Sequence, residues 1–251
     1  MFYVSARFTD GLGNRLFQYA AMIAYANKYG HTPVFVKSFI HSDPHNGSSI
    51  IDLFPEILVI DSLDSYLLFE EARKDCFTYI EIPYFKHNVI LKGYYQSPRY
   101  FENYCCPEPF TSLQQIDAIF LHVRRGDFLV CKHHAVDLTH FRRQSLMMIP
   151  KNCDICVCSD DIEWCKLWLP KLYGDIVLAH RWKFIDASPI ETIAIMSACS
   201  YGGICSNSTF SWWAGYWNMR RWSAKIYMPA IWGFKPMPPT IDLFPDWATV
   251  F

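Results

Sequence analysis

The sequence predicts an α/β protein in which short parallel strands alternate with helices in two successive units. Short apolar runs rich in Val, Ile, Phe and Tyr recur without alternating polar positions, which is typical of buried parallel strands. Between these runs, apolar residues recur at helical spacing. The 251 residues are 51% hydrophobic and 17% aromatic, which provides for one large core or two small ones.

The first unit begins as a strand, a glycine turn and a helix. Residues 2–8 form the predicted strand, residues 9–14 the turn, and the helix ends near Gly30. Further strands are expected at residues 32–37, 57–60 and 89–95. Residues 101–115 contain a Cys-Cys-Pro-x-Pro cluster that is typical of a connector. The chain is therefore expected to divide into residues 1–115 and residues 116–251.

The second unit alternates strands and helices regularly. The strands are expected at residues 118–124, 154–159, 176–179, 201–205 and 225–228, and the helices at residues 138–148, 161–169, 189–199 and 209–221. Strands separated by helices of this length pair in parallel through right-handed crossovers. In such a sheet, ligands bind in the crevice beyond the carboxyl ends of the strands.

Composition excludes several classes of function. With 23 basic and 24 acidic side chains, the net charge is −1, so no global field attracts nucleic acid or an anionic membrane. No apolar run reaches membrane-spanning length, and the first residues read as a strand with no export signal, so we expect a protein of the cytoplasm.

Ten cysteines raise the possibility of a metal site or of disulfide bonds, and we expect neither. Cys153 and Cys156 fall on a predicted strand, where they point to opposite faces and cannot converge on one tetrahedral ion. In a reducing compartment free cysteine behaves as a small buried hydrophobe. The full set is Cys76, Cys105, Cys106, Cys131, Cys153, Cys156, Cys158, Cys165, Cys199 and Cys205.

An anion site is indicated where the strand at residues 118–124 ends. Arg124 and Arg125 would stand at the crevice, and guanidinium forks suit phosphate oxygens. Gly126 allows close backbone approach, and Asp127 could hold one fork in place. The alternative is an ordinary Arg–Asp ion pair at a strand end.

Two further strand ends carry polar groups. Ser159, Asp160 and Asp161 follow one strand, and a carboxylate there can accept hydrogen bonds from guanine N1 and N2; the alternative is a helix N-cap. Residues 206–213 (SNSTFSWW) follow another strand and combine hydroxyls with helix N–H groups, which suits a phosphate. Agreement among three strand ends favours a nucleotide site.

Cofactors are not expected. Residues 11–14 (GLGN) lack the third glycine of a dinucleotide fingerprint, so an NAD-dependent oxidoreductase is a weak alternative; a tight βα turn explains them equally. No Asp-x-Asp pair occurs in the chain, and arginines can neutralise a diphosphate without Mg²⁺. We therefore expect no metal.

Five motifs, in order, resemble those of the α-1,2-fucosyltransferases of glycosyltransferase family 11 and, more distantly, those of the α-1,6- and protein O-fucosyltransferases. They are residues 11–20 (GLGNRLFQYA), 93–101 (GYYQSPRYF), 122–127 (HVRRGD), 159–165 (SDDIEWC) and 206–213 (SNSTFSWW). The resemblance spans nearly the whole chain. It implies a GT-B-like fold of two Rossmann-like domains with a cleft between them, the first on the acceptor side and the second binding the donor GDP-β-L-fucose.

The resemblance also implies inverting, metal-independent transfer of L-fucose to a glycan hydroxyl, such as the 2-OH of a galactose, by a protein of bacterial or viral source. Arg124 and Asp127 are the expected catalytic residues. Arg124 would bind the β-phosphate, and Asp127 would orient it or take the acceptor proton. The expected GDP-fucose ligands are Gly11, Gly13, Asn14, His122, Arg124, Arg125, Asp160, Ser206, Asn207, Ser208, Thr209 and Phe210.

Two departures from the family pattern concern the first loop. Asp10 stands where the family usually has a glycine, and Arg15 stands where it usually has a glutamine. Asp10 would repel a diphosphate, whereas Arg15 would offset that charge. The alternative to an enzyme is a non-catalytic sugar-nucleotide or glycan-binding protein of the same fold.

Overall fold

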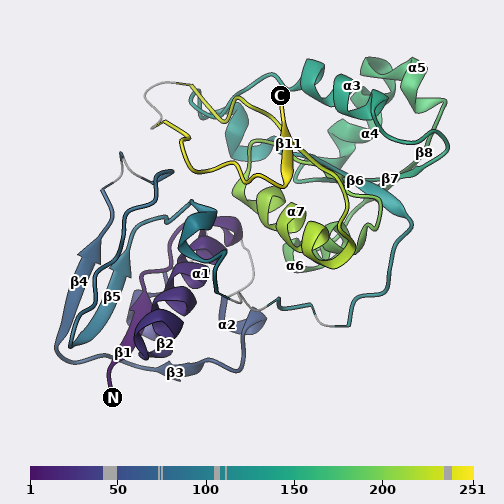
Figure 1. Cartoon of the computed structure of the whole chain (residues 1–251). Helices are drawn as coiled ribbons and strands as arrows, with labels where there is room; N and C mark the ends of the chain where they lie inside the picture. The colour runs from purple at the N-terminus through teal and green to yellow at the C-terminus, as the bar shows by residue number, and fades with distance from the viewer. Residues whose placement is uncertain (42–49, 73, 75, 105–107, 111, 235–238) are drawn as a thin grey trace. The chain divides into compact units, whose positions relative to one another are not determined.

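The chain folds into two compact units, each built around its own sheet (Figure 1). Unit 1 comprises Met1–Pro109 and Pro238–Pro245, and unit 2 comprises Phe110–Met237 and Asp246–Phe251. The computed structural model describes residues 1–41, 50–72, 74, 76–104, 108–110, 112–234 and 239–251. The division falls a few residues before the predicted boundary at 115/116.

Unit 1 contains a five-stranded parallel sheet in the order β3-β2-β1-β5-β4. Its elements are β1 (Tyr3–Ala6), α1 (Leu12–Tyr29), β2 (Thr32–Val36), α2 (Ile50–Leu53), β3 (Leu58–Ile60), β4 (Tyr66–Glu70) and β5 (Asn88–Lys92), with single 3-10 turns at Lys37–Phe39 and Pro98–Tyr100. The helix α1 packs on β1 and β2, and its own residues Leu16, Phe17 and Ala20 are buried. It ends at Gly30, whose φ of 71° is left-handed backbone that glycine adopts readily.

Unit 2 contains a six-stranded parallel sheet in the order β11-β10-β9-β6-β7-β8. Its elements are β6 (Ala118–Val123), α3 (Thr139–Met147), β7 (Asp154–Ser159), α4 (Ile162–Leu172), α5 (Gly174–Val177), β8 (Arg181–Ile185), α6 (Pro189–Ala198), β9 (Gly203–Ile204), α7 (Thr209–Trp222), β10 (Ile226–Met228) and β11 (Ala248–Val250), with a 3-10 turn at Gly126–Leu129. Counted within the unit, this is the 3-2-1-4-5-6 order of a Rossmann fold. The strand order reverses between β6 and β9.

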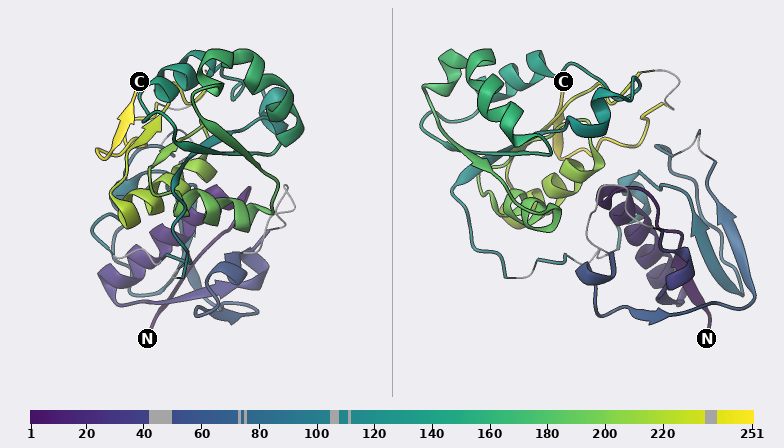
Figure 2. Two further views of the ribbon diagram at one scale, coloured as in Figure 1. Left: turned by 90° about the vertical axis from the view of Figure 1, so that its right-hand side faces the viewer. Right: turned by 180° about the vertical axis from the view of Figure 1, so that it is seen from behind.

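Two helical layers cover the sheet of unit 2 (Figures 1 and 2). Side chains alternate across β6, so Ile119, Leu121 and Val123 pack in one cluster with residues of α3, α4 and α5. His122 and Arg124 therefore leave the sheet on the opposite face, where α7 lies. The predicted class, α/β with two Rossmann-like domains of parallel strands, is confirmed by the two sheets.

Three strands were not predicted, and one prediction was wrong. The missed strands are β4, β8 and β11, all at sheet edges. Residues 176–179 were predicted as a strand, but Gly174–Val177 is the helix α5. Short apolar runs do not separate a strand from a buried helical turn.

The return of residues 239–245 to unit 1 was also not predicted. Asp242 accepts a hydrogen bond from the Tyr79 N–H (2.7 Å) and forms an ion pair with Arg99 (3.3 Å). Eight of the ten cysteines lie in the described part of the chain, and all eight are free. Cys105 and Cys106 lie outside the described residues.

Candidate functional site

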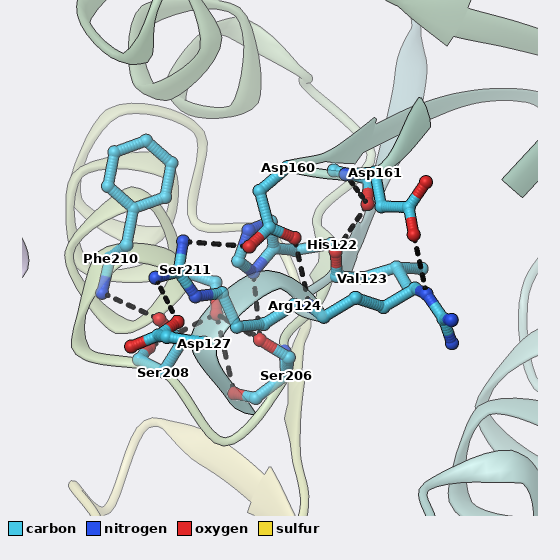
Figure 3. A network of polar contacts seen from close by, with 12 residues as sticks. His122, Val123, Arg124, Asp127, Asp160, Asp161, Ser206, Ser208, Phe210 and Ser211 are labelled. Atoms are coloured by element: carbon cyan, nitrogen blue, oxygen red, sulfur yellow. Dashed lines mark hydrogen bonds and ion pairs between the residues drawn. The ribbon is translucent and has the colours of Figure 1, made fainter. Parts of the chain in front are cut away.

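The reversal of strand order brings the ends of β6 and β9 together, and a buried pair joins them (Figure 3). His122 Nδ1 lies 2.8 Å from Ser206 Oγ, and both side chains are almost fully buried. Burial and, to a smaller extent, the charges of Arg124 and Arg142 lower the pKa of His122 to about 3. At neutral pH His122 is therefore an uncharged, fixed hydrogen-bonding group.

Arg124 lies between two carboxylates that come from different strand ends (Figure 3). Its Nη2 is 2.5 Å from Asp127 Oδ1, and its Nη1 is 3.0 Å from Asp160 Oδ2. The guanidinium also lies over the ring of Phe128, 5.4 Å from the ring centroid. The fork is held in place, with 18% of its side chain exposed. An incoming anion would compete with these carboxylates for the same N–H groups.

The contact between Asp160 and the loop after β6 leaves no room for a Cβ at position 126. A Cβ at Gly126 would lie 2.4 Å from Asp160 Oδ2, the oxygen that pairs with Arg124. The other oxygen of Asp160 accepts a hydrogen bond from the Arg125 N–H at 2.8 Å. Asp160 therefore ties the end of β7 to the loop after β6, and the absence of a side chain at Gly126 permits that contact.

Arg125 leaves the strand on the other side from Arg124. Its Nε is 3.0 Å from Asp161 Oδ2, and its guanidinium lies 3.7 Å from the centroid of the Trp164 ring. Asp161 also caps α4 by accepting a hydrogen bond from the Trp164 N–H. These contacts give Arg125 and Asp161 a structural role, which was the alternative expectation for Asp161.

The serine segment, residues 206–211 after β9, forms a second set of hydrogen bonds. Ser211 Oγ accepts a hydrogen bond from the Ser206 N–H at 3.2 Å and lies within bonding distance of the carbonyls of Ser206 and Ser208. Ser208 caps α7 by accepting from the Phe210 N–H, and Thr209 is the first residue of that helix. The Phe210 ring lies 5.6 Å from the His122 ring. Ser206, Ser208 and Phe210 are thus brought to the end of β6.

Asn207 is directed away from this set. Its amide nitrogen donates to the backbone carbonyls of His134 (3.0 Å) and Trp232 (2.9 Å), and only 3% of the residue is exposed. It anchors two loops to the serine segment. We expected Asn207 to bind the donor, but its amide donors are engaged by the backbone.

The glycine loop of unit 1 stands at the start of α1. Gly11 is the N-cap of the helix, Gly13 is buried in its first turn, and Asn14 Oδ1 accepts from Gln96 Nε2 at 2.7 Å. Arg15 was expected to offset the charge of Asp10, but it is 2% exposed and donates to the backbone carbonyls of Asp10 and His41, each at 2.8 Å. Arg15 closes the turn in which Asp10 adopts a φ of 60°.

The sequence analysis missed three residues around this site: Phe128 and His134 in the loop after β6, and Arg142 in α3, whose charge acts on His122. The Phe128 and His134 rings stack with their centroids 4.8 Å apart. Arg142 is 8% exposed, its Nε has no hydrogen-bond partner, and burial lowers the pKa of its guanidinium. A charged residue among the apolar positions of α3 was the available signal. Aromatic and His residues in a loop give no such signal.

Two properties of the described residues bear on ligands and membranes. Within the described ranges, no group of three or more His, Cys, Asp or Glu side chains is arranged to hold a metal ion. Across the same part of the chain, no helix combines the length and the apolar character that crossing a bilayer requires.

Comparison with known proteins agrees with the motifs. Residues 108–229 match the family model of glycosyl transferase family 11. An alpha-1,2-colitosyltransferase from Escherichia coli is 26% identical over an alignment 259 positions long, gaps included, which covers 86% of this chain and 88% of that protein. Among solved structures, NodZ alpha-1,6-fucosyltransferase soaked with GDP-fucose aligns at a TM-score of 0.48 and 16% identity, covering 85% of this chain and 91% of the other. Fucosyltransferase NodZ from Bradyrhizobium aligns over the same shares at a TM-score of 0.47 and 16% identity.

The family match includes the ends of β6, β7 and β9, where Arg124, Asp160 and Ser206 converge. The chain is a glycosyltransferase whose residues 108–229 match glycosyl transferase family 11.

Proposed function

We propose that this protein transfers L-fucose from GDP-β-L-fucose to a hydroxyl of a glycan acceptor, with inversion and without a metal ion. The observation that carries the proposal is the position of Arg124, a preorganised guanidinium at the point where the strand order of unit 2 reverses. The acceptor hydroxyl that we favour is the 2-OH of a galactose or a similar sugar, because the E. coli relative is an alpha-1,2-transferase.

In this proposal the protein acts mainly on the leaving group. Cleavage of the bond between the anomeric carbon and the β-phosphate oxygen leaves negative charge on the diphosphate. Arg124, the Ser206 hydroxyl, and the hydroxyl and N–H groups of Ser208 and Thr209 stabilise that charge. Each preorganised donor of this kind contributes about 2.7–4 kcal/mol to lowering a barrier. Because these groups are fixed before the donor arrives, little reorganisation is needed during the reaction.

The guanosine end of the donor is assigned to His122 and Asp160. His122 is uncharged and held by Ser206, so it can contact an aromatic base without an electrostatic cost. Asp160 uses one oxygen for Arg124 and one for the Arg125 N–H, and each carboxylate oxygen retains a second lone pair. Gly11, Gly13 and Asn14 stay predicted contacts from unit 1.

The direct test measures GDP release from purified protein supplied with GDP-fucose, with and without a galactose-terminated acceptor. We expect release that depends on the acceptor, and a fucosylated product that mass spectrometry identifies. Release without transfer would indicate a hydrolase. Binding of GDP-fucose without release in either arm would indicate a non-catalytic sugar-nucleotide-binding protein.

A second donor belongs in the same assay because of the colitosyltransferase relative. Colitose is L-fucose without the 3-hydroxyl, so both donors present the same GDP group to Arg124. GDP-colitose and GDP-fucose should be compared at equal concentration. A large preference for GDP-colitose would mean that the transfer reaction is as proposed but that the transferred sugar is colitose.

A further inference from the structure

The loop that follows β6 connects an imidazole to Arg124 through one phenyl ring. The Phe128 ring lies under the Arg124 guanidinium, 5.4 Å from its carbon, and stacks on the His134 ring at 4.8 Å with an interplanar angle of 22°. Arg124 and His134 thus contact the same phenyl ring. The distance from the Arg124 guanidinium carbon to the His134 ring centroid is therefore at most the sum of these two distances.

The imidazole of His134 is held by ring stacking and by the bonds of its loop. Its Nδ1 is buried without a hydrogen-bond partner and the residue as a whole is half-buried, which leaves Nε2 as the ring nitrogen that a substrate could reach. The backbone carbonyl of His134 accepts from Asn207 Nδ2 at 3.0 Å, and the carbonyl of neighbouring His133 accepts from the Phe234 N–H at 2.8 Å. The first bond anchors the loop to the segment before α7, and the second anchors it to Phe234.

The charges around His134 suit a group that gains a proton during a reaction. Burial lowers the pKa of His134, and neighbouring His133 lowers it further, so the ring is neutral and able to accept a proton near pH 7. Asp127 acts in the opposite direction and would stabilise the imidazolium once formed. Arg124, on the same phenyl ring, is paired with Asp127 and Asp160.

We propose that His134 Nε2 is the general base of the transfer reaction, an inference that rests on the function proposed above. The acceptor oxygen forms a bond to the anomeric carbon of fucose, and its proton passes to His134 Nε2. The bond from the anomeric carbon to the β-phosphate oxygen breaks, and its electron pair leaves with GDP beside Arg124. His134 then returns the proton to solvent. Asp127, which holds Arg124 at 2.5 Å, orients the arginine.

The test compares His134→Gln with His133→Gln, a matched change at the exposed neighbouring histidine. Single-turnover transfer is measured at saturating GDP-fucose and acceptor from pH 5 to 8, and GDP affinity is measured by calorimetry. We expect His134→Gln to slow transfer about 10²- to 10⁴-fold, to retain GDP affinity and to remove the decline of the rate at low pH. Added imidazole should restore part of the rate in His134→Ala. His133→Gln should transfer sugar at close to the wild-type rate and keep the decline at low pH, displaced slightly toward higher pH because the charge of His133 no longer lowers the pKa of His134.

The outcomes separate this inference from the proposed function. If wild type transfers sugar and His134→Gln does so within threefold, with the decline at low pH intact, His134 is not the base. If His134→Gln loses GDP affinity and transfer together, its role is structural and the inference is overturned. If wild type binds GDP-fucose but transfers nothing to any acceptor hydroxyl, the proposed function fails and the base has no reaction to serve.

Discussion

Replacing Arg124 with lysine tests the assignment of the leaving-group site. The arginine uses two nitrogens to reach two groups at once, Asp127 at 2.5 Å and Asp160 at 3.0 Å. An ammonium keeps the charge but lacks the planar fork, so it cannot hold a phosphate in the same two-point geometry. The substitution removes at least one charge-assisted hydrogen bond, which contributes about 1.5–3 kcal/mol. If that bond strengthens in the transition state, kcat/KM falls roughly 10- to 150-fold.

The matched control is Arg125→Lys, the adjacent arginine on the other face of the strand. That change removes the stacking of a guanidinium on Trp164 and the Nε contact with Asp161, and should destabilise the fold by roughly 0.5–2 kcal/mol. Steady-state GDP release and thermal unfolding are measured for both variants. We expect Arg124→Lys to lose activity with little change in Tm. We expect Arg125→Lys to lower Tm and to retain most of its activity. Activity of Arg124→Lys within threefold of wild type would refute the assignment of Arg124.

Four further predictions follow from the same contacts. Activity should survive EDTA, because Arg124 and the α7 start neutralise the diphosphate; loss in chelator that Mg²⁺ or Mn²⁺ restores would contradict this. Asp160→Ala should weaken GDP binding by roughly 1–3 kcal/mol and narrow the preference for GDP over UDP in calorimetry; tighter GDP binding would mean that Asp160 only competes for Arg124. Gly126→Ala should lower GDP affinity and cost roughly 1–3 kcal/mol of stability, because its Cβ meets Asp160 Oδ2 at 2.4 Å; wild-type values in titration and denaturant unfolding would exclude that clash. The pKa of His122 is about 3 in the folded state, below the unfolded value. Its contribution to the free energy of unfolding is therefore fully present above about pH 6.5 and declines as the pH falls toward 3, by at most about 1.4 kcal/mol per pH unit. An equally steep decline in His122→Gln would mean that other groups cause the loss of stability.

The predictable part of the fold is the buried part. The strands β1, β2, β6 and β7 are apolar runs because helices or loops cover both of their faces, and that signature is local in the sequence. The missed strands β4, β8 and β11 are edge strands. In β8, Arg181 and Lys183 alternate with apolar residues and pair with Asp154, each at 2.6 Å, so the strand lacks a continuous apolar run. Its pairing depends on partners distant in the sequence.

The candidate site divides in a similar way. Arg124, Asp127, Asp160 and Ser206 were predictable because each stands where a recognisable strand ends, and parallel strands bring such ends to one edge. The direction in which each side chain points was harder to predict from the sequence. Alternation along β6 separated Arg124 from Arg125 correctly, but nothing local indicated that Asn207 turns to the carbonyls of His134 and Trp232. Bonds between a side chain and a distant backbone group depend on the complete fold.

In the proposed function, the charges at the ends of β6 and β7 determine how a diphosphate would bind. Arg124 and Arg125 face Asp127, Asp160 and Asp161, so the paired groups alone carry one more negative than positive charge. Buried Arg142 restores the balance from the first turn of α3, and its field already contributes to lowering the pKa of His122. A diphosphate that binds Arg124 therefore replaces a carboxylate rather than filling an unopposed positive site. The carboxylates hold the guanidinium in position, and Asp127, with 45% of its side chain exposed, is the partner that would move into solvent at the lower cost when a donor binds.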